Sequence, residues 1–449
     1  MKNKIDFEKD NILFISNEQI YIDDFKKDND YHRQKIREKI EPWLTAVFQS
    51  EHLSLLVGSG LPISLNSVKV ENTEKSTKSE DNKDSTDNEN SMMNRIEFEN
   101  TAYKDLIKNK ADKEAKQMGR GEANFEDDLR VAIELLKGYE ILNNSQEPES
   151  LKQEINKYLN QLIQSILKNE QNFFSKQETL LILKKFLLSF SARSATRDRL
   201  KIFTTNYDRF IEYGLDEAGI LTLDRFIGKL KPIMRFHKID LDYHYNPPGI
   251  RGEPRYVEGV VRYTKLHGSL DWQFEDGNIV KMPIPFGAEV DEKYFNNPFD
   301  KVVIYPNSSK AVETSFFPYS ELFRDFSTAI CRPNSVLVTY GYGFGDSHIN
   351  RIIGDMLTIP STHLVIISYD LANNRIKNFI EKCNESQLTF LIGGELANIE
   401  HLTNYYLPKP AIDRITDRQT KILEKRKSTL EKKENDINNN DGDINETEF

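Results

Sequence analysis

The sequence predicts an α/β fold built on a mainly parallel sheet, and two observations support this prediction. Short apolar runs recur along the 449-residue chain, and each ends in a polar or glycine-rich turn. Helical periodicity follows most of these turns, and the repeated order of strand, turn and helix is typical of parallel strands. Ligands of such sheets bind beyond the carboxyl ends of the strands, so the turns are where a site is expected.

Seven short apolar segments are expected to form strands. In chain order they are 53–57, 201–204, 260–266, 302–305, 335–340, 363–369 and 388–391. Apolar residues recur at helical spacing in four further segments, which are 31–49, 125–139, 151–167 and 179–190.

Composition along the chain predicts three parts. Residues 1–50 form an N-terminal helical segment, and residues 51–410 form the main domain. Within that domain, 68–94 has almost no large apolar side chains and is expected to be disordered, whereas about 100–195 is a helical insertion. Residues 411–449 are expected to form a charged helix followed by a disordered tail.

Charge and cysteine content exclude some classes of protein. The net charge of −10 argues weakly against a dedicated nucleic-acid binder but leaves a local basic patch open. The two cysteines, Cys331 and Cys383, cannot form a zinc site on their own, so no zinc ribbon is expected. A charged N-terminus and the absence of a long apolar run indicate a protein of the cytoplasm, without a membrane span.

The first candidate site is Gly58-Ser59-Gly60, which follows the strand 53–57. Glycines allow a phosphate to approach the backbone, and free N–H groups at a helix start attract anions. The pattern is not a full G-x-G-x-x-G motif, because Ile63 stands at the third glycine position. Taken alone, a tight turn without a ligand is the more common interpretation.

Two more polar clusters follow strands. Asn206 and Asp208 come directly after 201–204, where Asn206 could orient a hydroxyl or water and Asp208 could accept from an amide or cap a helix. His267 follows 260–266 and precedes a glycine, a position that suits general-base chemistry. A turn-forming Asn and a structural His are the competing interpretations.

The fourth cluster is the late glycine-rich turn Gly341-Tyr342-Gly343-Phe344-Gly345-Asp346. Its glycines could admit a ribose, or they could serve the geometry of the turn alone. Asp346 is predicted to be the N-cap of a helix that contains Ile349 and Met356. No metal-ligand spacing, P-loop or G-x-S-x-G elbow occurs, so no metal is expected, and a nucleoside triphosphatase or α/β-hydrolase is disfavoured.

The order of these clusters resembles the sirtuin family, and more closely the bacterial sirtuin-like proteins of anti-phage defence. The resemblance covers roughly 50–400 and is carried by the segments 57–64, 204–208 and 265–272. It implies a Rossmann-like sheet and NAD as the substrate. It also implies a HerA-family ATPase as a partner and assembly into homo-oligomers.

The resemblance also implies roles for individual residues. Asn206 would place the nicotinamide ribose and the attacking water, and His267 would act as the base. The other expected NAD-binding residues are Gly58, Ser59, Gly60, Ser64, Thr205, Asp208, Gly341, Gly343 and Phe344.

Two departures from the family change the expected activity. Thr205 stands where protein-deacylating sirtuins usually have Gln, and the four-cysteine zinc module that supports their peptide groove is missing. The sequence therefore favours NAD hydrolysis to nicotinamide and ADP-ribose, through an oxocarbenium-like state. An NAD or ADP-ribose sensor without turnover is the alternative, and a protein deacylase is disfavoured.

Overall fold

The computed structural model describes residues 5–15, 17–21, 30–68, 95–99, 104–117, 122–142, 147–194, 196–236, 241–245, 255–289, 298, 302–304 and 318–409. Apart from Val68, the insertion 68–94 that was expected to be disordered lies outside the described residues. The expected C-terminal helix and tail, 411–449, also lie outside them.

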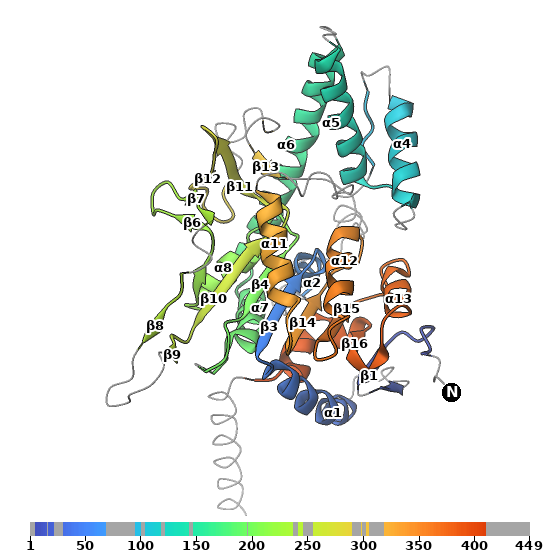
Figure 1. Cartoon of the computed structure of the whole chain (residues 1–449), viewed down its shortest axis with the longest axis vertical. Helices are drawn as coiled ribbons and strands as arrows, with labels where there is room; N and C mark the ends of the chain where they lie inside the picture. Colours follow the sequence, from blue (N-terminus) through green and yellow to red (C-terminus); the bar gives the residue numbers. More distant parts are fainter. Residues whose placement is uncertain are drawn as a thin grey trace, which may run out of the picture. The chain divides into compact units, whose positions relative to one another are not determined.

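A nine-stranded sheet forms the centre of the fold (Figure 1), in the order β2-β1-β16-β15-β14-β3-β4-β10-β5. Neighbouring strands from β16 to β5 are parallel, which confirms the predicted α/β fold with a mainly parallel sheet. The parallel strands are β3 (His52–Val57), β4 (Lys201–Thr204), β5 (Leu221–Leu223), β10 (Val260–Lys265), β14 (Ser335–Tyr340), β15 (His363–Ser368) and β16 (Leu388–Ile392).

Two strands near the N-terminus were not predicted from the sequence. β1 (Ile12–Ile15) pairs antiparallel with β16, and β2 (Glu18–Tyr21) pairs antiparallel with β1. The segment 1–50 therefore contributes an edge of the sheet as well as helix α1 (Asp30–Phe48). A run of four apolar residues such as 12–15 is too short to separate a strand from a buried loop by periodicity.

Helices cover both faces of the sheet. Side chains alternate along β3, so that Leu55 and Val57 join one core cluster while Leu56 joins the other. The first cluster lies under α1, α2 (Gly60–Asn66), α7 (Gln177–Ser191), α8 (Phe210–Glu217), α14 (Gly394–Ala397), α15 (Ile399–His401) and η5 (Leu402–Tyr406). The second lies under α11 (Tyr319–Ile330), α12 (Ser347–Met356) and α13 (Arg375–Ile380).

Three of the helices between β3 and β4, α4 to α6, form a separate layer at one end of the sheet (Figure 1). α4 (Lys104–Gln117), α5 (Phe125–Ile141) and α6 (Glu147–Phe174) enclose a third core cluster. Leu270 and Ile284, from beyond β10, complete this cluster, so the helices are packed against the main domain. Helix α7, which the sequence groups with them, packs under the sheet instead.

A second sheet corrects the prediction for 302–305. β13 (Val302–Ile304) is a strand, but it pairs antiparallel with β11 (Gly268–Glu275) and does not join the parallel sheet. This antiparallel sheet also contains β12 (Asn278–Lys281), β7 (Ile233–Met234) and β6 (Phe226–Ile227). A short apolar run predicts a strand without predicting its partner, because the pairing is decided by tertiary contacts.

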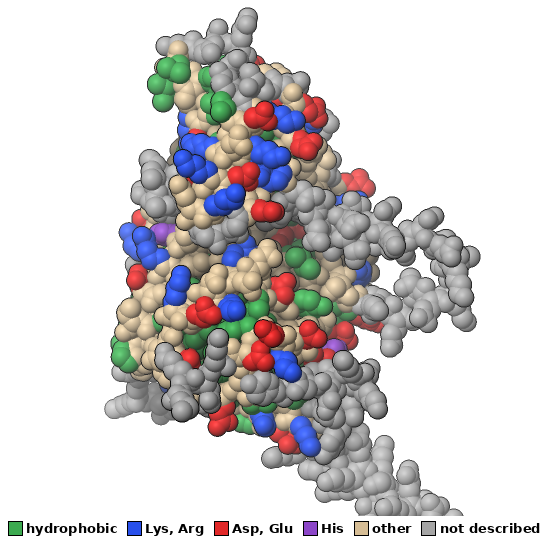
Figure 2. Space-filling model, turned by 90° about the vertical axis from the view of Figure 1, so that its right-hand side faces the viewer, with side chains coloured by type: hydrophobic (Ala, Val, Ile, Leu, Met, Phe, Trp, Pro, Cys, Tyr) green, Lys and Arg blue, Asp and Glu red, His purple; other side chains and the backbone are tan. Residues whose placement is uncertain are grey.

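The surface of α4 is locally basic although the chain is acidic overall. Lys104, Lys108, Lys110, Lys113 and Lys116 are all exposed. Figure 2 shows Lys and Arg side chains gathered over this part of the molecule, interspersed with acidic ones. Among the helices that the structure describes, none is long and apolar enough to cross a membrane.

Candidate active site

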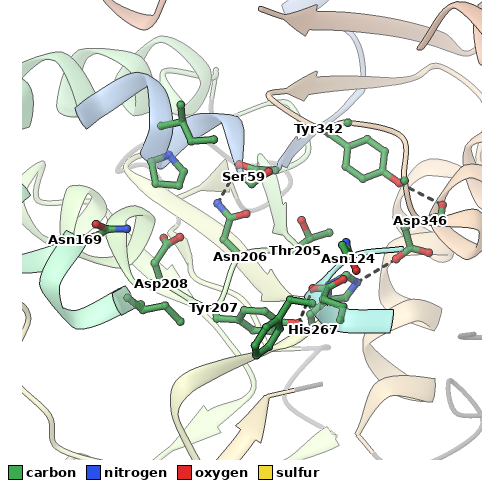
Figure 3. A pocket seen from close by; sticks show the side chains of 18 of the residues that line it. Ser59, Asn124, Asn169, Thr205, Asn206, Tyr207, Asp208, His267, Tyr342 and Asp346 are labelled. Carbon is green, nitrogen blue, oxygen red and sulfur yellow. Dashed lines mark hydrogen bonds and ion pairs between the residues drawn. The ribbon is translucent and has the colours of Figure 1, made fainter. Parts of the chain in front are cut away.

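A pocket of about 290 Å³ lies beyond the carboxyl ends of β3, β4 and β14 (Figure 3). This is where ligands bind in parallel α/β sheets. Three groups of residues line it: the turn after β3, the loop after β4 and residues of the helical insertion. His267 and the turn after β14 complete the wall, so all four clusters predicted from the sequence meet here.

Asn206 is held against the first glycine turn. Its Nδ2 donates to the carbonyl oxygen of Gly58 at 3.0 Å, and its backbone N–H donates to Oγ1 of Thr204 at 3.1 Å. Thr204 in turn donates to the carbonyl of Val57 at 2.9 Å. These bonds join the ends of β3 and β4, and they leave Oδ1 of Asn206 to accept from a ligand hydroxyl or a water.

Asp208 lies in the same pocket, beside Asn169 in Figure 3. Burial raises the pKa of its carboxyl group to about 7, and the nearby carboxylates of Glu170 and Glu212 act in the same direction. The ammonium of Lys265 opposes them. Asp208 therefore changes charge near neutral pH, and it can accept or donate a hydrogen bond to a ligand amide.

Buried charges anchor the loop that carries these residues. Glu170 of α6 is fully buried and accepts from the backbone N–H of Arg209 at 3.0 Å and from its Nη2 at 2.6 Å. Lys265 donates to the backbone carbonyls of Tyr207 and Asp208 and pairs with Glu212 at 3.1 Å. The loop is thus fixed from the helical insertion and from β10 together.

His267 is buried at the end of β10, and its Nε2 lies 3.1 Å from Oδ2 of Asp346. Two aromatic rings lie near the imidazole ring, with the centroid of Tyr207 6.4 Å and that of Phe323 6.3 Å from its own. Figure 3 shows His267 and Asp346 on one side of the pocket and Asp208 on the other, with Asn206 between them.

The helical insertion forms one wall of the pocket. Asn124, Phe125 and Glu126 line it from the start of α5, where Asn124 and Asp127 form a reciprocal capping box. The hydroxyl of Tyr207 donates to Oε1 of Glu126 at 3.1 Å. This bond ties the insertion to the loop after β4, next to His267.

Not every predicted NAD-binding residue lines the pocket. Those that do are Gly58, Ser59, Thr205, Asn206, Asp208, His267 and Gly343. Gly60 and Gly341 instead pack against each other, and Ser64 accepts from the backbone N–H of Ile399 at 3.1 Å. Phe344 is buried in the second core cluster, against Phe379.

Sequence reasoning missed several residues that line the pocket. Glu126 lies at the start of the predicted helix 125–139 and Asn169 lies in the long helix α6, and neither belongs to a motif that the sequence analysis singled out. Arg375 was also missed; its guanidinium lies beside Gly343, where an added Cβ would sit 3.2 Å from Nη2. This arginine brings a positive charge to the wall, which suits an anionic part of a ligand.

Comparison with known families is consistent with this geometry. Fold and pocket define an α/β protein with a ligand site at the carboxyl ends of parallel strands. Residues 200–388 match the family model described as the SIR2-like domain, so this part of the chain is similar to that family. The match includes Asn206, His267 and Asp346 but not the first glycine turn. No curated protein sequence matches the chain significantly.

Among the described residues, no group of three His, Cys, Asp or Glu side chains is arranged to hold a metal ion.

Proposed function

We propose that this protein is an NAD hydrolase that releases nicotinamide and ADP-ribose. The observation that carries the proposal is the meeting of Asn206 and His267 in one pocket, with an acidic group at Asp208 and a cationic one at Arg375. Pocket and charges suit a substrate with an amide-bearing ring at one end and a diphosphate at the other. The sirtuin-like match over 200–388 supports NAD as that substrate.

The chemistry requires a water and a base. The bond between the ribose C1′ and the pyridinium nitrogen breaks, and its electron pair stays on nicotinamide. The water oxygen bonds to C1′ of the oxocarbenium-like ribose, and its proton passes to His267. Asn206 orients the ribose hydroxyls or that water through Oδ1, because Nδ2 is held by Gly58. Asp208 interacts with the carboxamide of nicotinamide.

The wall formed by the helical insertion favours hydrolysis over peptide deacylation. Phe125, Leu162 and Ile166 bring apolar side chains to the pocket from α5 and α6. In this proposal they exclude a peptide and shield the reacting ribose from bulk solvent. The same enclosure lets fixed dipoles and charges stabilise the developing positive charge.

The biological setting that we propose is bacterial anti-phage defence in the cytoplasm. Depletion of NAD would stop the infected cell before phage are released. Because uncontrolled NAD loss is toxic, we propose that assembly regulates the enzyme, through homo-oligomers bound to a HerA-family ATPase. The four polar or glycine-rich clusters that follow the predicted strands resemble those of sirtuin-like defence proteins, and this resemblance supports the setting.

Nicotinamide release from NAD tests the proposal. The purified protein is assayed alone and with a HerA-family ATPase, and the Asn206→Ala and His267→Ala variants are compared with the wild type. Exposed His244, on the hairpin strand β8 (His244–Tyr245), provides the matched control as His244→Ala. We expect both site variants to lose at least about 100-fold in rate, because His267→Ala removes the general base and Asn206→Ala removes the group that orients the ribose or the water.

Three outcomes would contradict the proposal. No release under any assembly condition would leave an NAD sensor as the better interpretation, provided that NAD still binds. Site variants as active as the wild type would exclude these residues from the chemistry. Release that depends on an acetyl-lysine peptide would identify a deacylase.

A further inference from the structure

The two oxygens of the Asp346 carboxylate contact different groups. Its Oδ1 accepts from the backbone N–H groups of His348 at 3.0 Å and Ile349 at 3.3 Å, which makes it the N-cap of α12. Its Oδ2 lies 3.1 Å from Nε2 of His267. The side chain is only 6 % exposed, so one buried group links the start of a ten-residue helix to the imidazole.

This geometry determines which nitrogen of His267 carries the proton. The N–H donors and the positive end of the α12 dipole stabilise the ionised carboxylate, which accepts hydrogen bonds only. Nε2 of the neutral imidazole must therefore be the protonated nitrogen. The lone pair is then on Nδ1, which becomes the nitrogen that can take up a proton.

We propose that Asp346 is a positioning residue, which holds His267 in the Nε2–H tautomer and stabilises the imidazolium that forms when the ring accepts a proton. The carboxylate stabilises the imidazolium because it faces the developing positive charge across one hydrogen bond in a buried site. An aspartate plays this part toward a general-base histidine in hydrolases of unrelated fold. The catalytic consequence rests on the proposed NAD hydrolysis, whereas the tautomer does not.

Among the described residues, Tyr207 lies beside the ring, and Glu126 and Tyr319 act on the Tyr207 hydroxyl. Tyr207 follows β4, Glu126 starts α5 and Tyr319 starts α11. Burial raises the pKa of the Tyr207 hydroxyl well above its usual value, and Glu126, Tyr319 and Asp346 raise it further, so Tyr207 remains neutral beside His267. Of the carboxylates, Glu126 is bonded to the Tyr207 hydroxyl and Asp346 to the imidazole itself.

Two substitutions separate the positioning role from the capping role. Asn and Ser are both good N-cap residues, so Asp346→Asn and Asp346→Ser preserve the cap of α12. Asp346→Asn can donate to Nε2 and so favours the opposite tautomer, whereas Asp346→Ser removes the carboxylate from the ring. The matched control is Asn398→Ser, because Oδ1 of Asn398 caps α15 with the same pair of bonds, from Glu400 at 2.9 Å and His401 at 3.3 Å.

The first measurement needs no activity. Histidine labelled with nitrogen-15 reports the tautomer and pKa of each ring by NMR, and His267→Gln assigns the signal. We expect the Nε2–H tautomer in the wild type, the Nδ1–H tautomer in Asp346→Asn, and a lower pKa for His267 in both Asp346 variants. A wild-type Nδ1–H tautomer, or an unchanged tautomer and pKa in the variants, would overturn the proposal even if the protein cleaves NAD.

The second measurement is the rate of nicotinamide release. We expect kcat to fall at least about tenfold in both Asp346 variants, with a much smaller change in KM, while Asn398→Ser matches the wild type. A kcat that is preserved in Asp346→Asn would overturn the catalytic consequence. If the wild type releases no nicotinamide at all, NAD hydrolysis fails as the function, and the NMR result still decides the positioning of His267.

Discussion

Gly60 and Gly341 pack backbone against backbone beneath the pocket. The N–H of Gly60 donates to the carbonyl of Gly341 at 3.0 Å, and a Cβ added at Gly60 would lie 2.5 Å from the Cα of Gly341. Gly341 also has a φ of +59°, which side chains rarely adopt. The two glycine turns, 281 residues apart in the chain, thus join the ends of β3 and β14 at the site.

Alanine at either glycine is therefore expected to destabilise the protein. Gly60→Ala forces two backbone segments apart and should lower the free energy of unfolding by about 1–3 kcal/mol, the usual cost of overpacking. Gly341→Ala adds the strain of a positive φ and should cost at least as much. Urea unfolding followed by circular dichroism measures both effects.

Gly354 provides the control for these glycines. It lies in α12, and nothing lies within 4 Å of the position that a Cβ would take. Gly354→Ala should raise stability by about 0.5–1 kcal/mol, the ordinary gain of alanine in a helix. If Gly60→Ala were as stable as Gly354→Ala, close packing of the two turns would not be the reason for the glycines.

The parallel sheet could be predicted from the sequence because its strands are buried on both faces. Such strands are continuous apolar runs, and 53–57, 335–340 and 363–368 are recognisable for this reason. The partner of 302–304 could not be predicted, since a strand that short can pair with either sheet. β1 and β2 escaped prediction for a similar reason, because nothing in 12–21 indicates pairing with β16.

The candidate site could be predicted where it depends on strand ends. Asn206 and His267 lie where the order of the clusters placed them, because parallel strands bring their carboxyl ends to one edge. Glu126 and Asn169 could not be found in this way. They reach the pocket through the packing of the helical insertion, which leaves no local pattern in the sequence.

The buried pair of Glu170 and Arg209 should be essential for stability. Glu170→Gln removes the charge that pairs with the guanidinium, which is 8 % exposed, and leaves the Arg209 backbone N–H with at most a neutral amide oxygen as acceptor. Breaking a buried pair by removing one partner costs about 3–5 kcal/mol. We expect a loss of this size by urea unfolding, together with loss of activity as the 205–209 loop loosens.

An exposed ion pair offers the comparison for Glu170. Lys231 and Glu275 lie 2.8 Å apart, but both side chains are about half exposed. Glu275→Gln should change stability by at most about 1 kcal/mol, because water screens such pairs. Equal losses for Glu170→Gln and Glu275→Gln would show that burial of the first pair does not matter.

Asp208 should make the stability depend on pH. The pKa of its carboxyl group is raised to about 7 in the folded protein, from 3.8 ordinarily. Between these values the folded state binds more protons than the unfolded state, so stability falls as pH rises from about 4 to 7. Asp208→Asn removes this loss and should be more stable than the wild type at pH 8, by roughly 1–4 kcal/mol.

Urea unfolding of both proteins at pH 5 and pH 8 tests the sign of this effect. The advantage of Asp208→Asn should be smaller at pH 5 than at pH 8, because the folded wild-type carboxyl group is still protonated at the lower pH, whereas the unfolded one is already ionised. Asp216→Asn is a useful comparison, since burial raises the pKa of Asp216 to a smaller extent. An advantage that does not change with pH would contradict the raised pKa of Asp208.

The bond between Tyr207 and Glu126 should couple the helical insertion to the pocket. Tyr207→Phe removes the donor that Glu126 accepts at 3.1 Å, and leaves a carboxylate in the wall without that bond. A hydrogen bond to a charged group contributes about 1.5–3 kcal/mol, so local order at the start of α5 should fall. Hydrogen exchange at 125–129 should therefore become faster, and KM for NAD should rise several-fold with a smaller change in kcat.

Tyr213→Phe is the control for Tyr207→Phe, because Tyr213 stacks on Phe286 away from the pocket, with ring centroids 4.2 Å apart. Unchanged exchange in Tyr207→Phe would mean that the capping box of Asn124 and Asp127 alone holds the insertion in place.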